Sequence, residues 1–201
     1  MKIGTRDMIL ISLFAALTAI GAFIKVPTPL VPFTLQFLFC TFAGLLLGSH
    51  HALYSQLLYI LIGLIGVPIF ANGGGLTYLL QPTFGYLIGF AACAYLVGYF
   101  SEHKVQIKFW SIFGIIILGL IVDYVCGVSY LYLVVNFYLQ KDMSVWSALM
   151  VGFIPYVTFD VLQSALIASI AVKVVPIIRR AGYAKIAHFS GPKDNKNVKV
   201  L

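Results

Sequence analysis

Asp160, Gln163 and Ser164 are the polar residues whose spacing is most typical of a binding site. They occupy positions i, i+3 and i+4 of a strongly apolar stretch, so on a helix all three face one side. A carboxylate, an amide and a hydroxyl placed in this way can bind a small polar ligand or hydrogen-bond to a neighbouring helix. Because ionisable residues within apolar spans usually serve a function, we interpret this polar stripe as a binding site.

Catalytic chemistry has less support from the sequence. An intramembrane hydrolase needs a nucleophile and a base at the same depth. Ser129, which follows Gly127 and Val128, is expected in the outer half of its apolar segment, whereas the four histidines are expected at the inner boundaries. No cluster has metal-ligand spacing, and no Gly-Lys-Ser/Thr run could hold a nucleotide phosphate. We therefore expect no enzyme activity, no catalytic residue, no metal and no cofactor.

The composition places these residues in a membrane. The 201 residues are 61% hydrophobic and 9% charged, with a mean hydropathy of +1.01, whereas about a quarter of the residues in a soluble domain are charged. At roughly 20 residues per spanning helix, the chain has room for about six spans. We predict an all-α integral membrane protein: a six-transmembrane-helix bundle over residues 1–190 and a polar cytoplasmic tail over 191–201. The predicted spans are Met8–Ile24, Leu35–Gly48, Ala52–Phe70, Pro82–Phe100, Trp110–Phe137 and Ala148–Val172.

The distribution of Lys and Arg predicts the orientation. With a cytoplasmic N-terminus, eleven of the thirteen basic residues lie on the inner side, and only Lys25 and Lys141 lie outside. An even number of spans in a cell membrane, with both termini cytoplasmic, follows. The net charge of +7 is then explained by topology and by contact with membrane lipid, so we expect no nucleic-acid partner.

Two outer connections are unusually apolar for loops. Residues 25–36 contain three prolines, which favour an extended or turned segment, and residues 68–82 contain Gly73, Gly74 and Gly75 directly after Asn72. Non-helical backbone near membrane depth is tolerated where protein buries it or where it lines a cavity. We therefore predict that both connections form extracellular lid loops over a pocket at the outer face.

Four motifs resemble those of a known family. They are Gly66-Val-Pro-Ile-Phe-Ala71, Gln81-Pro-Thr-Phe-Gly-Tyr-Leu-Ile-Gly-Phe90, Pro155-x-x-x-x-Asp160 and the proline-rich segment Val26–Gln36. The chain from Met8 to Val175 is similar to the BioY family, the biotin-specific substrate-binding subunits of energy-coupling factor (ECF) transporters. The resemblance implies capture of biotin near the outer face. It also implies a coupling transmembrane subunit and two ATPase subunits as partners, with ATP bound only by the latter.

The resemblance also implies roles for individual residues. Asn72 and Asp160 match positions that bind the biotin head group, and Ala15 and Ala19 match positions that contact the coupling subunit. A ureido ring has two N–H donors and one carbonyl, which a carboxylate and an amide complement. The remaining predicted pocket residues are Phe33, Gln36, Phe70, Tyr78, Gln81, Tyr86 and Gln163.

One position departs from the family pattern. Gln163 stands where the family commonly has a Lys that can meet the biotin carboxylate. The candidates left for that contact are Lys25, Tyr86, Gln163 and the backbone N–H groups of residues 72–75.

Three alternatives to biotin capture remain at this stage. The first is the same architecture with another vitamin as its ligand. The second is a membrane enzyme that uses Asp123, Asp160 or Ser129. The third is a purely structural membrane subunit. Asp123 lies inside the fifth span and has no assigned role.

Overall fold

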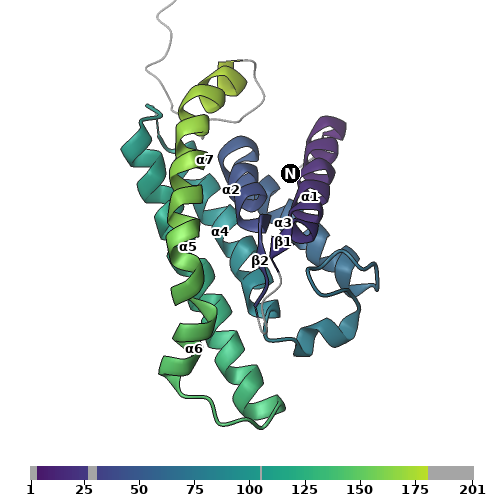
Figure 1. The fold of residues 1–201 in the computed structure, drawn as a ribbon. Helices are drawn as coiled ribbons and strands as arrows, with labels where there is room; N and C mark the ends of the chain where they lie inside the picture. Colours follow the sequence, from purple (N-terminus) through teal and green to yellow (C-terminus); the bar gives the residue numbers. More distant parts are fainter. Residues whose placement is uncertain (1–3, 27–30, 105, 181–201) are drawn as a thin grey trace, which may run out of the picture.

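The computed structural model describes residues 4–26, 31–104 and 106–180, and within them the chain is almost entirely helical (Figure 1). A two-stranded antiparallel ribbon, β1 with β2, pairs Lys25 with Thr34 and Val26 with Phe33. The elements are α1 (Thr5–Phe23), β1 (Lys25–Val26), β2 (Phe33–Thr34), α2 (Gln36–Leu47), α3 (Ser49–Leu64), the 3₁₀ helix η1 (Leu76–Leu80), α4 (Phe84–Glu102), α5 (Phe109–Leu133), the π-helical segment η2 (Val134–Tyr138), α6 (Val145–Gly152) and α7 (Ile154–Arg180).

The predicted sixth span is wrong as a single helix. Instead of running unbroken over Ala148–Val172, the chain leaves the helical conformation at Phe153, between α6 and α7. Pro155 explains the break, because it has no N–H to donate to the carbonyl of Val151 and its ring would crowd that carbonyl. The described residues therefore contain seven α-helices, and four helical segments are long and apolar enough to cross a membrane: α1, α4, α5 with η2, and α7.

The third span also differs from the prediction, whereas the fifth does not. The third predicted span ends early, at Leu64, because Gly66 adopts a positive φ of 117° and Pro68 follows it. The fifth agrees with the prediction within one residue at each end, because α5 and η2 together run from Phe109 to Tyr138. The connection after α3 is consequently longer than predicted.

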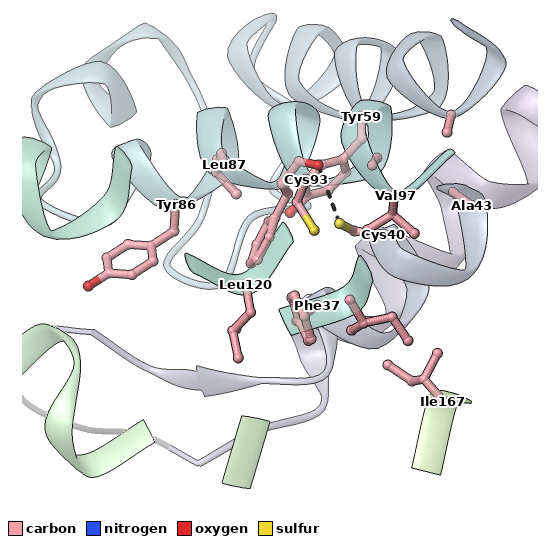
Figure 2. Close-up of a cluster of buried hydrophobic side chains, with 14 of the residues drawn as sticks. Phe37, Cys40, Ala43, Tyr59, Tyr86, Leu87, Cys93, Val97, Leu120 and Ile167 are labelled. Carbon is pink, nitrogen blue, oxygen red and sulfur yellow. Dashed lines mark hydrogen bonds between the residues drawn. The ribbon is translucent and has the colours of Figure 1, made fainter. Parts of the chain in front are cut away.

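Helix α4 is at the centre of the bundle. It packs against α2, α3 and α5, and the core between these helices contains aliphatic and aromatic side chains. Figure 2 shows this core, where Phe37 and Cys40 of α2 lie near Cys93 of α4, Leu120 of α5 and Ile167 of α7. Large apolar side chains such as Leu61 and Ile121 are exposed on the outside of the bundle, where a membrane would cover them.

A cluster of paired polar groups joins the helices at one end of the bundle. The Glu102 carboxylate, at the end of α4, accepts hydrogen bonds from the backbone N–H (2.7 Å) and the hydroxyl (3.1 Å) of Ser49, at the start of α3. Arg179 of α7 donates to the carbonyls of Ser101 (2.7 Å) and Lys104 (2.9 Å). We call Ser49, Ser101, Glu102 and Arg179 the paired polar end. The start of α1 and the end of α7 lie at this end of the bundle (Figure 1).

Candidate functional site

A cavity opens at the opposite end of the bundle from the paired polar end. It encloses about 590 Å³ of empty space, including open solvent at its mouth. Its walls come from the segment around β2, from the connection between α3 and α4, and from helices α2, α4, α5 and α7. The lining residues are Val31, Pro32, Phe33, Thr34, Gln36, Phe37, Ala71, Tyr78, Thr83, Tyr86, Leu87, Phe90, Asp123, Tyr124, Gly152, Tyr156 and Asp160.

Asp160 is the cavity carboxylate held in place by hydrogen bonds. The Tyr124 hydroxyl of α5 donates to its Oδ2, and the Ser164 hydroxyl donates to its backbone carbonyl at 2.6 Å. Both partners are buried, so the side chain of Asp160 has a fixed position between α5 and α7. Its other carboxylate oxygen is available to accept a hydrogen bond from a ligand in the cavity.

Aromatic residues form much of the cavity wall. The Tyr86 hydroxyl donates to the carbonyl of Gly152 (2.8 Å), which joins α4 to the end of α6. Gly127 makes room for this ring, because a Cβ atom there would lie 2.3 Å from it. Phe33 contacts Tyr156 and Phe159 of α7, with ring centroids 5.8 Å and 4.2 Å away. These rings provide a rigid apolar surface suited to a flat or aliphatic ligand.

The two connections over the cavity are tied to the helices and to each other. The Lys25 ammonium donates to the carbonyl of Ala71. The Tyr156 hydroxyl donates to the carbonyl of Val31 (2.5 Å), and the Tyr59 hydroxyl donates to that of Ile69 (3.1 Å). Non-helical carbonyls that would otherwise be unpaired are thus satisfied from α3, β1 and α7.

Tyr78 closes the cavity on the η1 side. Its ring packs on Phe70, with centroids 4.5 Å apart, and its hydroxyl accepts a hydrogen bond from Thr83 at 3.1 Å. Burial raises the pKa of this hydroxyl above its ordinary value, although Thr83 and the backbone of Asn72 partly offset the effect. Tyr78 is therefore neutral at physiological pH and offers a ligand a hydroxyl group instead of a charge.

The structure brings five of the predicted pocket residues together around the cavity. Four others lie elsewhere: Asn72 and Gln81 are exposed outside the lining, Phe70 is buried against Tyr78, and Gln163 is buried and is not part of the lining. Both amide atoms of Gln163 are without a hydrogen-bond partner within the described part of the chain. The five lining residues are Phe33, Gln36, Tyr78, Tyr86 and Asp160.

Sequence reasoning missed several lining residues, and signals for two of them were present. Tyr156 precedes Asp160 by four residues, so the two share one side of α7. Tyr124 is adjacent to Asp123 within a long apolar helix, where a hydroxyl needs a partner. Ser129, the nucleophile of the enzyme alternative, is exposed and does not line the cavity.

The two alanines predicted to contact a partner share one side of α1 but differ in burial. Ala15 is only 4% exposed, whereas Ala19 is partly exposed. The small residues that α1 presents on its outer side are Ser12 and Ala16.

The structure has long apolar helices and a polar, aromatic cavity near one end of the bundle. These features are typical of multi-pass membrane proteins that hold a small molecule.

Comparison with known proteins identifies the family within this class. The model of the BioY family matches residues 1–180. A protein of Lysinibacillus sphaericus named as a probable biotin transporter BioY is 44% identical, over 91% of this chain and 93% of its own. The biotin transporter BioY of Thermotoga maritima is 37% identical, over 84% and 95%.

The fold agrees with these matches. The crystal structure of the S-component for biotin from an ECF-type ABC transporter superposes with a TM-score of 0.72 at 22% identity, covering 84% of this chain and 90% of the other. This chain therefore belongs to the BioY family. As a member of a family of transporters it is a multi-pass membrane protein and not an enzyme.

Proposed function

We propose that this protein is the biotin-binding subunit of an ECF-type transporter in the cell membrane, with both termini cytoplasmic. The observation that carries the proposal is the cavity in which Tyr124 fixes the Asp160 carboxylate between aromatic walls. Support for biotin as the ligand comes from relatives named biotin transporters that align over most of both chains.

The chemistry of the cavity complements the two parts of biotin. The ureido ring carries two N–H donors, and Asp160 offers a carboxylate oxygen as an acceptor. The thioether ring and the valeryl chain are apolar, and Phe33, Tyr86 and Phe90 line the cavity. In this proposal Asn72 and Gln81 belong to lid loops over residues 25–36 and 68–82, and they reach the ligand when these loops close.

The ligand carboxylate has few possible partners. No Lys or Arg lines the cavity formed by the described residues, and Gln163 has an uncharged amide. Lys25 is the cation best placed, because its ammonium already reaches the carbonyl of Ala71, which is itself a lining residue. We propose that Lys25 meets the carboxylate at the mouth of the cavity.

Transport requires energy from elsewhere. We propose that a coupling transmembrane subunit contacts α1 near Ala15 and Ala19, and that two ATPase subunits bind ATP. Six crossings result if α6 and α7 together form the last one. Membrane lipid covers the exposed apolar surface, and nucleic acid has no part in this function.

Calorimetric titration of the detergent-solubilised, ligand-free protein with biotin tests the proposal. We expect sub-micromolar binding that Asp160→Asn weakens by about 2 kcal/mol, roughly thirtyfold, because a charged hydrogen bond is lost. The matched control is Asp142→Asn, an exposed carboxylate outside the cavity, which should bind like the unmodified protein. No heat with biotin from folded protein would contradict the proposal, and a panel of other vitamins would then follow.

A further inference from the structure

Asp123 is a second carboxyl group in the cavity, and it lacks the partners that Asp160 has. It lies on α5, is only 4% exposed and lines the cavity. Its Oδ1 atom has no hydrogen-bond partner among the described residues. A buried carboxyl oxygen without a partner is costly, and folded proteins rarely keep one without a reason.

The described residues packed beside Asp123 outside the cavity make no hydrogen bond to its Oδ1 atom. One turn before it, Leu120 points into the apolar core, next to Cys93 and Phe37 (Figure 2). On the α4 side stands Gly89, where a Cβ atom would lie 2.2 Å from Oδ1. The glycine leaves just enough space for the carboxyl group and contributes no side chain. Because Asp123 lines the cavity, a ligand there can supply the missing donor for Oδ1.

Asp123 and Asp160 reach the same cavity from neighbouring helices. Tyr124, the residue after Asp123, donates its hydroxyl to Asp160, which links the two positions directly. A metal ion is a poor candidate occupant, because no group of three His, Cys, Asp or Glu residues in the described part of the chain could hold one. An organic ligand with two N–H donors on one edge suits two acceptors on adjacent helices.

We propose that Asp123 is a second ligand-binding residue, which accepts a hydrogen bond from one ureido N–H of biotin while Asp160 accepts one from the other. This inference rests on the proposed function. It makes Asp123 a determinant of specificity, because a ligand that lacks the second N–H would leave a buried acceptor unpaired.

The experiment compares two variants and two ligands. Asp123→Asn has nearly the volume of aspartate, Asp123→Ala removes the carboxyl group without adding bulk beside Gly89, and Asp142→Asn serves as the control for an exposed carboxylate. Binding of biotin and of 2-iminobiotin is measured by calorimetry, and thermal unfolding is measured without ligand. In 2-iminobiotin a C=NH group replaces the ureido C=O, so the protonated ring is cationic and depends more on nearby carboxylates.

We expect Asp123→Asn to weaken biotin binding by about tenfold or more, and 2-iminobiotin binding by a larger factor. Asp123→Ala should lose binding further while melting no lower than the unmodified protein, because it removes an unpaired buried polar atom. A loss below tenfold in a folded Asn variant would overturn the inference. Equal losses for both ligands, or failure of both variants to fold, would also overturn it, since each indicates a packing role. If the unmodified protein does not bind biotin, the proposed function itself fails.

Discussion

The polar side chains at the two ends of this bundle differ in whether they are hydrogen-bonded to the rest of the chain. At the paired polar end, Glu102 and Arg179 bind the chain itself, satisfying the start of α3 and the end of α4. At the cavity end, Asp123 has an unpaired oxygen and Asp160 is fixed by a tyrosine but not neutralised by a described cation. Polar groups that bind each other hold helices together, whereas polar groups left open in a cavity are available to a ligand.

This difference predicts that stability and ligand affinity can be changed separately. Substitutions at the paired polar end should lower the stability of the bundle and leave the dissociation constant for biotin unchanged. Substitutions in the cavity should change the dissociation constant for biotin and leave the stability of the bundle unchanged, unless they also disturb helix packing.

Gly89→Ala should have the largest effect, because it should lower both the stability of the bundle and the affinity for biotin. The added methyl group would lie 2.2 Å from Oδ1 and 2.9 Å from the backbone of Asp123, so α4 and α5 must move apart. Overpacking of this kind costs about 1–3 kcal/mol, and it displaces a cavity carboxyl as well. We expect a lower melting temperature and weaker biotin binding. Gly114→Ala on α5, where a methyl group meets open space, is the matched control. Normal melting of Gly89→Ala would contradict the close packing.

Glu102→Ala should affect stability alone. It removes the acceptor for the Ser49 N–H and hydroxyl at the start of α3, and loss of such a cap costs roughly 0.5–2 kcal/mol. Thermal unfolding in detergent should shift downwards, while calorimetry with biotin should give an unchanged dissociation constant. A changed affinity with unchanged melting would show that the two ends are not independent.

Tyr156→Phe should affect the residence time of the ligand. The variant keeps the ring against Phe33 but loses the hydrogen bond to the carbonyl of Val31. Loss of about 1 kcal/mol from the segment over the cavity corresponds to roughly fivefold faster release. Stopped-flow displacement of a fluorescent biotin derivative measures the rate. Tyr132→Phe is the control, because Tyr132 lies on α5 outside the cavity. Equal release rates would show that this bond does not hold the segment closed.

Lys25→Met should have the smallest effect, because Lys25 is exposed and exposed ion pairs contribute little. We expect biotin affinity to fall by a factor of at most about five, and the affinity for biotin methyl ester, which has no carboxylate, to change less. Lys141→Met tests for a general effect of surface charge. An equal change for the acid and the ester would remove Lys25 as the partner of the carboxylate.

Composition predicted the helical class, and local chemistry predicted part of the site. Asp160, Tyr86 and Tyr78 line the cavity as expected. Isolated polar residues in apolar helices have few places to lie other than a cavity or a contact between helices. The break at Phe153 was missed, since hydropathy continues across Gly152 and Pro155. Pro155 was the available signal, because a proline inside a helix removes a hydrogen bond from the preceding turn.

The sequence could not predict that Ala15 is buried or that Asp123 has an unpaired oxygen. Both depend on which side of a helix meets its neighbours, and spans that are apolar on all sides carry little periodic signal. Gln163 shows the same limit: it shares a helical side with Asp160 in sequence, yet it is buried and is not part of the cavity lining.

The cavity gathers residues from Val31 to Asp160, and its last carboxylate is on α7, the final described helix. During synthesis, the ribosome must therefore release nearly the whole chain into the membrane before a complete site exists. Every earlier intermediate would lack Asp160, although it could already contain the central helix α4 and most of the aromatic wall. A copy truncated before α7 would therefore lack both Asp160 and the wall that Tyr156 provides.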